Sequence, residues 1–205
     1  MNGLTLDTLQ ADALRETANI GAGHAATALS QMMGATIMIK VPSIGVLGVG
    51  DVPARINEDE EPVAAVQMAM LGDLTGTTVL VFPKRTVMRM AEMMLRRPLG
   101  SSVTFTELET SAIKEAGNIL SAAYMNALSE LFDVTLLPSP PSLVIDMSKA
   151  VLRSTLGGEP SVARSVLCVE SEFQLVGQDA GLRGFFLLLP DPDALQRMLQ
   201  AMRLG

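Results

Sequence analysis

The sequence predicts a mixed α/β fold made of two related halves, each with the element order α-β-β-β-α. Two observations lead to this expectation: a polar pattern occurs twice at an offset of 99 residues, and in each copy a long helix-like segment precedes strand-like runs. A repeat of this length indicates two half-domains rather than a solenoid of short units. We therefore expect one domain spanning residues 1–205, built of repeats at about 1–100 and 101–205 and related by a pseudo-two-fold axis.

The first helix is predicted over residues 6–33, which are rich in Ala, Leu, Met and Gln and contain no proline. Gly34 is placed to end it. Gly21 and Gly23 lie inside this helix, and their GxG spacing indicates close helix packing rather than nucleotide binding.

The rest of the first half contains the expected strands and a second helix. Residues 35–41 are rich in β-branched residues, and Pro42 is expected to end that strand. The runs 63–70 and 75–82 are separated by a turn and predict an antiparallel hairpin. A helix follows over residues 83–97, with proline in its first turn.

The second half repeats this order after a join at residues 98–102. The expected elements are a helix over 106–132, a strand over 134–137, helical spacing over 142–156, strands over 165–174 and 184–189, and a closing helix over 193–204. Strands of both halves are expected to form an antiparallel sheet flanked by the long helices.

The repeated polar pattern is a group of side chains with a proline behind them. The first copy is Asp12, Glu16, Asn19 and Pro42, and the second is Ser111, Glu115, Asn118 and Pro141 (115 − 16 and 118 − 19 give 99). Apolar residues match at the same offset, among them Leu9 with Leu108, Ala13 with Ala112 and Ile20 with Ile119. A shared packing face would produce such apolar matches, and helix composition would produce some of them by chance, whereas the repeated Glu, Asn and Pro indicate a shared role.

Composition excludes several classes of protein and of site. A formal charge of −7 argues against nucleic-acid binding, which needs clustered Lys and Arg. One histidine, His24, and one cysteine, Cys168, do not form a zinc cluster of usual spacing or a disulfide framework. Neither a signal peptide nor an apolar run long enough to cross a bilayer is visible. We expect a cytoplasmic protein with no membrane insertion, no bound metal and no bound cofactor.

Helix geometry places each polar group on one face. Positions i, i+4 and i+7 lie within about 60° of one another, so Asp12, Glu16 and Asn19 share a stripe about 10 Å long. Ser111, Glu115 and Asn118 do the same in the second copy. Apolar neighbours border both stripes, whose length suits contact with the surface of a partner protein.

The chemistry of the stripes favours placement of a water molecule. These residues could simply solvate a helix, but Asn is a poor residue for a helix interior and occurs twice at the matching position. A carboxylate and an amide do not make a strong nucleophile pair. An amide can hold a water by donating and accepting hydrogen bonds together, as the water-orienting Gln of GTPases does for attack on phosphorus. The carboxylate could engage a cation on the partner.

The spacing Asp/Ser-x3-Glu-x2-Asn-x22-Pro resembles the signature of the CheC, CheX and FliY family of chemotaxis phosphatases. Both copies fit it completely, residues 19–30 resemble the helix around the first site, and the similarity extends over essentially the whole chain. Two full copies without a C-terminal flagellar-switch extension are most similar to the CheC branch, since CheX resembles it with one intact Glu/Asn pair and FliY carries an additional domain.

The resemblance implies hydrolysis of the aspartyl phosphate of the response regulator CheY. It implies that Asn19 and Asn118 orient the attacking water, that Glu16 and Glu115 contact the regulator's lysine, and that CheY supplies Mg²⁺. It also implies binding of the receptor deamidase CheD, which stimulates such proteins. The alternative is a non-catalytic adaptor for phosphorylated CheY or CheD, or a flagellar switch-type interaction protein, and either site could be the more active one.

Overall fold

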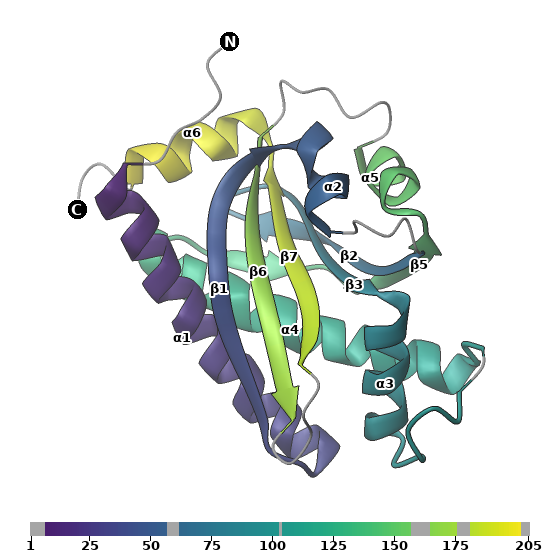
Figure 1. Cartoon of the computed structure of the whole chain (residues 1–205). Helices are drawn as coiled ribbons and strands as arrows, with labels where there is room; N and C mark the ends of the chain where they lie inside the picture. Colours follow the sequence, from purple (N-terminus) through teal and green to yellow (C-terminus); the bar gives the residue numbers. More distant parts are fainter. Residues whose placement is uncertain (1–6, 57–61, 103, 157–164, 176–180, 202–205) are drawn as a thin grey trace.

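The computed structural model describes residues 7–56, 62–102, 104–156, 165–175 and 181–201 (Figure 1). The first half contains α1 (Thr8–Met33), β1 (Ile37–Gly48), the 3-10 turn η1 (Val49–Asp51), α2 (Val52–Ile56), β2 (Val63–Gly72), β3 (Gly76–Pro83) and α3 (Lys84–Met94). The second half contains α4 (Glu107–Phe132), β4 (Leu136–Pro138), β5 (Ser142–Asp146), α5 (Ser148–Leu156), β6 (Ser165–Leu175), β7 (Leu182–Pro190) and α6 (Pro192–Ala201). The mixed α/β class expected from the sequence is confirmed.

All strand pairs of the seven-stranded sheet are antiparallel, and the sheet draws on both halves. The order is β1-β6-β7-β3-β2-β4, with β5 also paired to β2. The order is symmetric. If β1 is exchanged with β4, β6 with β2 and β7 with β3, the same order is read from the opposite edge. The register agrees: Ile37 of β1 lies opposite Leu175 of β6, and its counterpart Leu136 of β4 lies opposite Gly72 of β2. Each half therefore supplies an edge strand that pairs with a strand of the other half.

Alternate residues of the central strands enter two separate cores, as the two-residue period of a strand requires. Val66, Leu80 and Phe186 point to the face covered by α1, α4, α3 and α6. Val81 and Phe185 point to the opposite face, which α2 and α5 cover in part. Both long helices consequently lie on the same face of the sheet (Figure 1).

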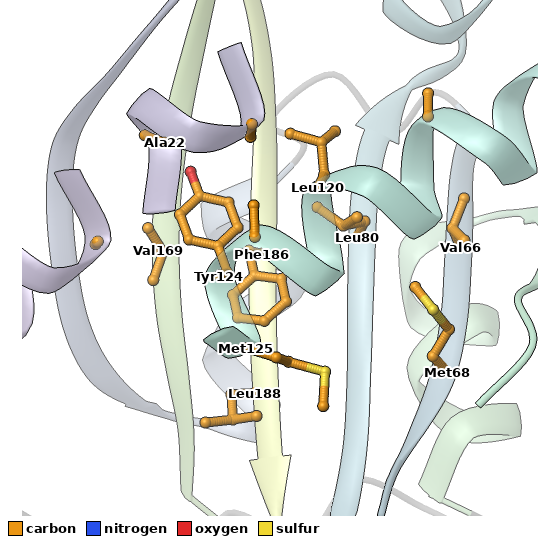
Figure 2. Close-up of a cluster of buried hydrophobic side chains, with 14 of the residues drawn as sticks. Ala22, Val66, Met68, Leu80, Leu120, Tyr124, Met125, Val169, Phe186 and Leu188 are labelled. Atoms are coloured by element: carbon orange, nitrogen blue, oxygen red, sulfur yellow. The ribbon is translucent and has the colours of Figure 1, made fainter. Parts of the chain in front are cut away.

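The two long helices cross in close contact because small residues lie where they meet. A Cβ added to Gly21 would stand 3.1 Å from the ring of Tyr124 and 3.2 Å from the carbonyl oxygen of Ala123. Tyr124 stacks on Phe186 with ring centroids 4.8 Å apart (Figure 2). The Tyr124 hydroxyl lies 2.6 Å from Ser171 Oγ. The packing reason given for the GxG pair therefore holds for Gly21. It does not hold for Gly23, which has open space around it.

Two strand boundaries differ from the sequence prediction. Pro42 does not end β1, which continues to Gly48 with a register shift between Lys40 and Ser43. A bulge accommodates a proline because its missing N–H then leaves no ladder bond unmade. The helical prediction for residues 142–156 is wrong over residues 142–146, which form β5 against β2. Hydrogen bonding of these residues to β2 outweighs the helical spacing of their apolar side chains.

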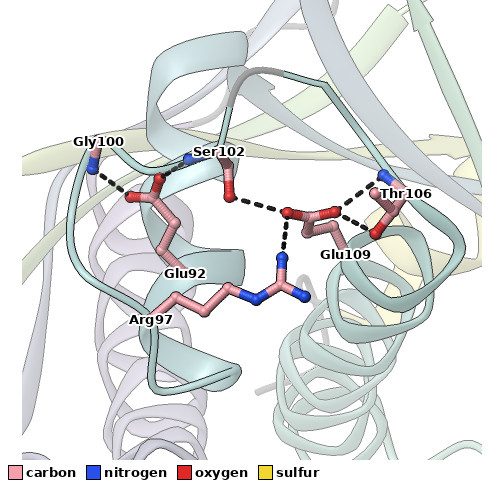
Figure 3. Close-up of polar contacts among 6 residues, drawn as sticks. All are labelled: Glu92, Arg97, Gly100, Ser102, Thr106 and Glu109. Atoms are coloured by element: carbon pink, nitrogen blue, oxygen red, sulfur yellow. Dashed lines mark hydrogen bonds and ion pairs between the residues drawn. The ribbon is translucent and has the colours of Figure 1, made fainter.

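A buried carboxylate network fastens the join between the halves (Figure 3). Glu92 of α3 accepts hydrogen bonds from the backbone N–H groups of Gly100 and Ser102, at 2.8 and 2.7 Å. Glu109 of α4 accepts from Arg97 Nη1, Ser102 Oγ and the backbone N–H of Thr106, each at 2.8 Å. Ser102 thus links both carboxylates, and Thr106 with Glu109 forms the capping box that begins α4.

Hydrogen bonding keeps both of these carboxylates ionised. Burial would raise the pKa of Glu92, but the backbone N–H groups of Ser102 and Gly100 outweigh it and lower that pKa. Side-chain hydrogen bonds from Thr106 and Ser102 lower the pKa of Glu109 to about 2.

Within the described residues, no helix is long and apolar enough to cross a membrane.

Replacing Gly117 by Ala is expected to destabilise the protein by about 1–3 kcal/mol. The added Cβ would stand 2.6–2.9 Å from the side-chain carbons of Val66, so helix and sheet must separate. Gly23→Ala is the matched control: it meets no neighbour and should stabilise by about 0.5–1 kcal/mol through helix propensity. Urea unfolding measures both, and equal stability of the parent and Gly117→Ala would show that this contact is not tight.

Glu109→Gln is expected to lower stability at neutral pH and to matter less in acid. The folded-state pKa of Glu109, about 2, lies below the ordinary value of 4.5. The stabilisation of the folded state by this carboxylate is therefore fully present above pH 4.5 and disappears as the pH falls toward 2. Urea midpoints measured from pH 7 to pH 3 should converge for the two proteins. Glu107→Gln, at an exposed position in the same helical turn, is the control and should show no comparable convergence.

Candidate functional site

The first predicted stripe lies on the outer surface of α1. Asp7 caps this helix through a capping box with Gln10, and Gly34 ends it with a left-handed backbone. Buried Leu14, Ala18 and Ala22 face the sheet, which turns the stripe outward. Asp12, Glu16 and Asn19 are all exposed, and with Arg15 and Ile20 they line an open hollow of about 540 Å³.

The second stripe lies at the matching place on α4. Ser111 and Glu115 are exposed, whereas Asn118 is half-buried. Gly117, beside Asn118, packs on Val66 of the sheet, so the backbone at this stripe is held against the core. The structure therefore joins Asp12, Glu16 and Asn19 on one helix and Ser111, Glu115 and Asn118 on another.

The side chains of the two Glu/Asn pairs are left available for a partner. Within the described part of the chain, neither a hydrogen bond nor an ion pair occupies Glu16, Asn19, Glu115 or Asn118. An unpaired amide in a helix interior adds nothing to the stability of the fold. This availability is what contact with a second molecule requires.

The stripes differ in their first residue. Asp12 accepts a hydrogen bond from Arg15 Nη2 at 2.7 Å, and both side chains are more than half exposed. At the second stripe Ser111 has no charge, and Lys114 takes the place of Arg15. Sequence reasoning missed Arg15, although its i, i+3 spacing from Asp12 was a usable signal.

Large apolar side chains lie exposed next to both stripes. Leu9 is 82% exposed and Leu108, its repeat counterpart, is 61% exposed. Each precedes its stripe by one helical turn. Ile20, at the other end of the first stripe, is 46% exposed. Exposed leucines in matching places add an apolar border of the kind that protein interfaces contain.

The motif prolines belong to the sheet rather than to the stripes. Pro42 is exposed at the irregular point of β1, and Pro141 is half-buried directly before β5. The second copy contains Pro138, Pro140 and Pro141 where the first has one proline, and its strand is divided into β4 and β5. The prolines thus shape the edge strands.

Other candidate chemistry finds little support in the described residues. These contain no group of three or more His, Cys, Asp or Glu side chains arranged to hold a metal ion. Burial raises the pKa of the Cys168 thiol to about 12, so it packs as an inert side chain. His24 is exposed on α1.

Comparison with known proteins places the same two helices in one family. The profile of the CheC-like family matches residues 9–46 and 108–145, two segments that are themselves 99 residues apart. The chain is 31% identical to the CheY-P phosphatase CheC of Bacillus subtilis over 199 residues, covering 94% of this chain and 93% of that one.

Solved structures show the same architecture. FliY of Thermotoga maritima superposes with a TM-score of 0.77 at 25% identity over 98% of both chains. The FliM middle domain of H. pylori shares the fold, with a TM-score of 0.69 at 13% identity over 96% of this chain and 99% of that one. Because the profile falls on both stripe-bearing helices and the identity to a CheC extends over nearly the whole of both sequences, this chain belongs to the CheC-like family.

Proposed function

We propose that this chain is a phosphatase that hydrolyses the aspartyl phosphate of a CheY-type response regulator, with one site on α1 and one on α4. The observation that carries the proposal is the repeated pair of a carboxylate and an amide, held on long helices without hydrogen-bond or ion-pair partners among the described residues. Membership in the CheC-like family and the name of the B. subtilis relative support the same reaction.

The amides of Asn19 and Asn118 are proposed to position the attacking water. The side-chain oxygen of each amide accepts a hydrogen bond from the water, and the NH₂ group donates one, which fixes the direction of the lone pair that attacks. The water oxygen bonds to phosphorus while the bond from phosphorus to the aspartyl oxygen breaks. The electron pair of that bond stays on the regulator's carboxylate, and the proton lost by the water goes to the released phosphate.

The carboxylates of Glu16 and Glu115 are proposed to bind a lysine of the regulator. Each lies one helical turn before its Asn on the same face, so an ion pair there orients the amide toward the phosphoryl group. Mg²⁺ bound by the regulator would stabilise charge on the phosphoryl oxygens. The apolar border formed by Leu9, Leu108 and Ile20 supplies contact area around these polar groups.

CheD is a second proposed partner, on the ground of the sequence resemblance. The same resemblance leaves a non-catalytic adaptor as the competing function. Phosphate release from an excess of phosphorylated CheY, measured with and without CheD, separates them: a phosphatase completes many turnovers and an adaptor completes none. Faster release in the presence of CheD would support the second partner.

Asn19→Ala combined with Asn118→Ala is expected to lower kcat by about 100-fold while binding of phosphorylated CheY is retained. The amides are proposed to act on the water, so their removal leaves the docking surface intact. Each single variant should keep the activity of the unchanged site, so the kcat of each single variant measures how much that site contributes to the total activity.

The matched control for this pair is Asn126→Ala, at an exposed position on α4 beyond the stripe, and it should behave as the parent. Full activity in the double variant would contradict water positioning by the amides. Loss of binding together with activity would instead assign the amides to docking.

Glu16→Gln with Glu115→Gln is expected to raise KM about tenfold with a smaller change in kcat, because a charge-assisted contact to the partner is lost. The KM of the parent should rise with salt concentration more steeply than that of the variant. Glu130→Gln removes a charge from an exposed position of α4 outside the stripe and serves as the control. An unchanged KM in the stripe variant would remove these carboxylates from the docking site.

A further inference from the structure

A second concave site lies away from both stripes, between α3, the join of the two halves and the start of β7. Its volume is about 630 Å³, within the range of small-molecule pockets. Arg85 and Arg89 of α3 line it together with apolar side chains that include Met88 and Leu99, and Arg183 borders it at the start of β7. None of the stripe residues contributes to it.

The two arginines of α3 lack an ion-pair partner among the described residues. Arg85 and Arg89 are spaced i, i+4 on α3 and therefore lie on one face. Neither forms an ion pair or a hydrogen bond with any residue that the structure describes. Two guanidinium groups with no carboxylate partner in the described part of the chain are informative in a protein of net charge −7.

Arg183 borders the pocket from the sheet, but its guanidinium is engaged on the other face. Its Nε donates to Glu170 Oε1 at 2.5 Å, and its guanidinium carbon lies 4.8 Å from the centroid of the Phe185 ring. Phe185 points to the face of the sheet opposite α3. The positive charge available in the pocket therefore comes from Arg85 and Arg89.

The carboxylate in the wall of the pocket does not neutralise the arginines. Glu92 lines the pocket, but its two oxygens accept hydrogen bonds from the backbone N–H groups of Gly100 and Ser102. The negative charge of Glu92 is thereby stabilised by backbone groups of the segment that joins the halves. The amino-terminal end of α3, which includes Arg85 and Thr86 of the lining, adds a favourable helix dipole for an anion.

We propose that this pocket binds a small organic phosphate. A phosphoryl group carries nearly two negative charges at neutral pH and three acceptor oxygens, which matches two guanidinium groups at the amino-terminal end of a helix better than a carboxylate with one charge and two oxygens. The apolar lining provided by Met88, Leu99 and Leu182 accommodates the organic part of the ligand. This site is independent of the phosphatase proposal, since it shares no residue with it.

The test uses phenyl phosphate and inorganic phosphate as probes, followed through the backbone amide NMR signals of the full chain at constant ionic strength. Phenyl phosphate is expected to saturate, to shift the amides of Arg85, Thr86 and Arg89, and to bind at least about tenfold more tightly than inorganic phosphate because of its ring. The absence of saturation by about 10 mM, or shifts confined to other surfaces, would overturn the proposal.

Substitutions locate the binding. Arg85→Gln and Arg89→Gln should each weaken phenyl phosphate at least about tenfold, and an unchanged amide spectrum elsewhere shows that they are folded. Lys84→Gln removes the same charge from the same helix without lining the pocket and should bind as the parent does. An equal loss of affinity in Lys84→Gln would show that phenyl phosphate is attracted by the general positive charge of α3 and not by a defined site.

Two further measurements separate this site from other anion binding. The Asn19→Ala, Asn118→Ala double variant should bind phenyl phosphate normally, and a loss there would place the phosphate at the stripes instead. A short polyglutamate peptide is the alternative anion: binding of the peptide without binding of phenyl phosphate would overturn the small-molecule assignment in favour of an acidic protein partner.

Discussion

The antiparallel pairing of β3 with β7 is the interaction on which the rest of the structure depends. Leu80 lies opposite Phe186 and Val79 opposite Leu187, and all four side chains are buried. Through this pair the strands of the two halves become one sheet, and β1 and β4 take equivalent places at opposite edges. Because strand residues alternate between faces, the pairing also sends one apolar set toward α1 and α4. Both stripe-bearing helices are thereby held on a common support.

The surface of these helices is organised for something other than stability. A helix of a globular protein gains most from its buried face, and Leu14, Ala18 and Ala22 supply this in α1. On the other side, Leu9 is exposed to water and Asn19 forms no hydrogen bond with any described residue. Under the proposed function, contact with a phosphorylated partner gives both side chains a role, and the reactive phosphorus belongs to that partner.

The join between the halves shows how buried charge is made tolerable. Glu92 and Glu109 are almost completely buried, yet both are stabilised as anions by hydrogen bonds from the segment that connects α3 to α4. A buried carboxylate is costly unless its oxygens are satisfied in this way. The same arrangement withdraws Glu92 from the arginines beside it, which leaves a basic pocket in an acidic protein. Local hydrogen bonding thus determines the charge that the surface presents.

The sequence alone determined the duplication, the long helices and the membership of each polar stripe, because all three depend on spacing along the chain. Asp12, Glu16 and Asn19 share a face by helix geometry, and helix composition extends to Gly34. Only the tertiary structure decided that β1 continues past Pro42, that residues 142–146 pair with β2, and that Arg85 and Arg89 line a pocket with the start of β7. These features depend on contacts between residues far apart in sequence, and local propensity contains no information about which distant strand or helix will be the neighbour.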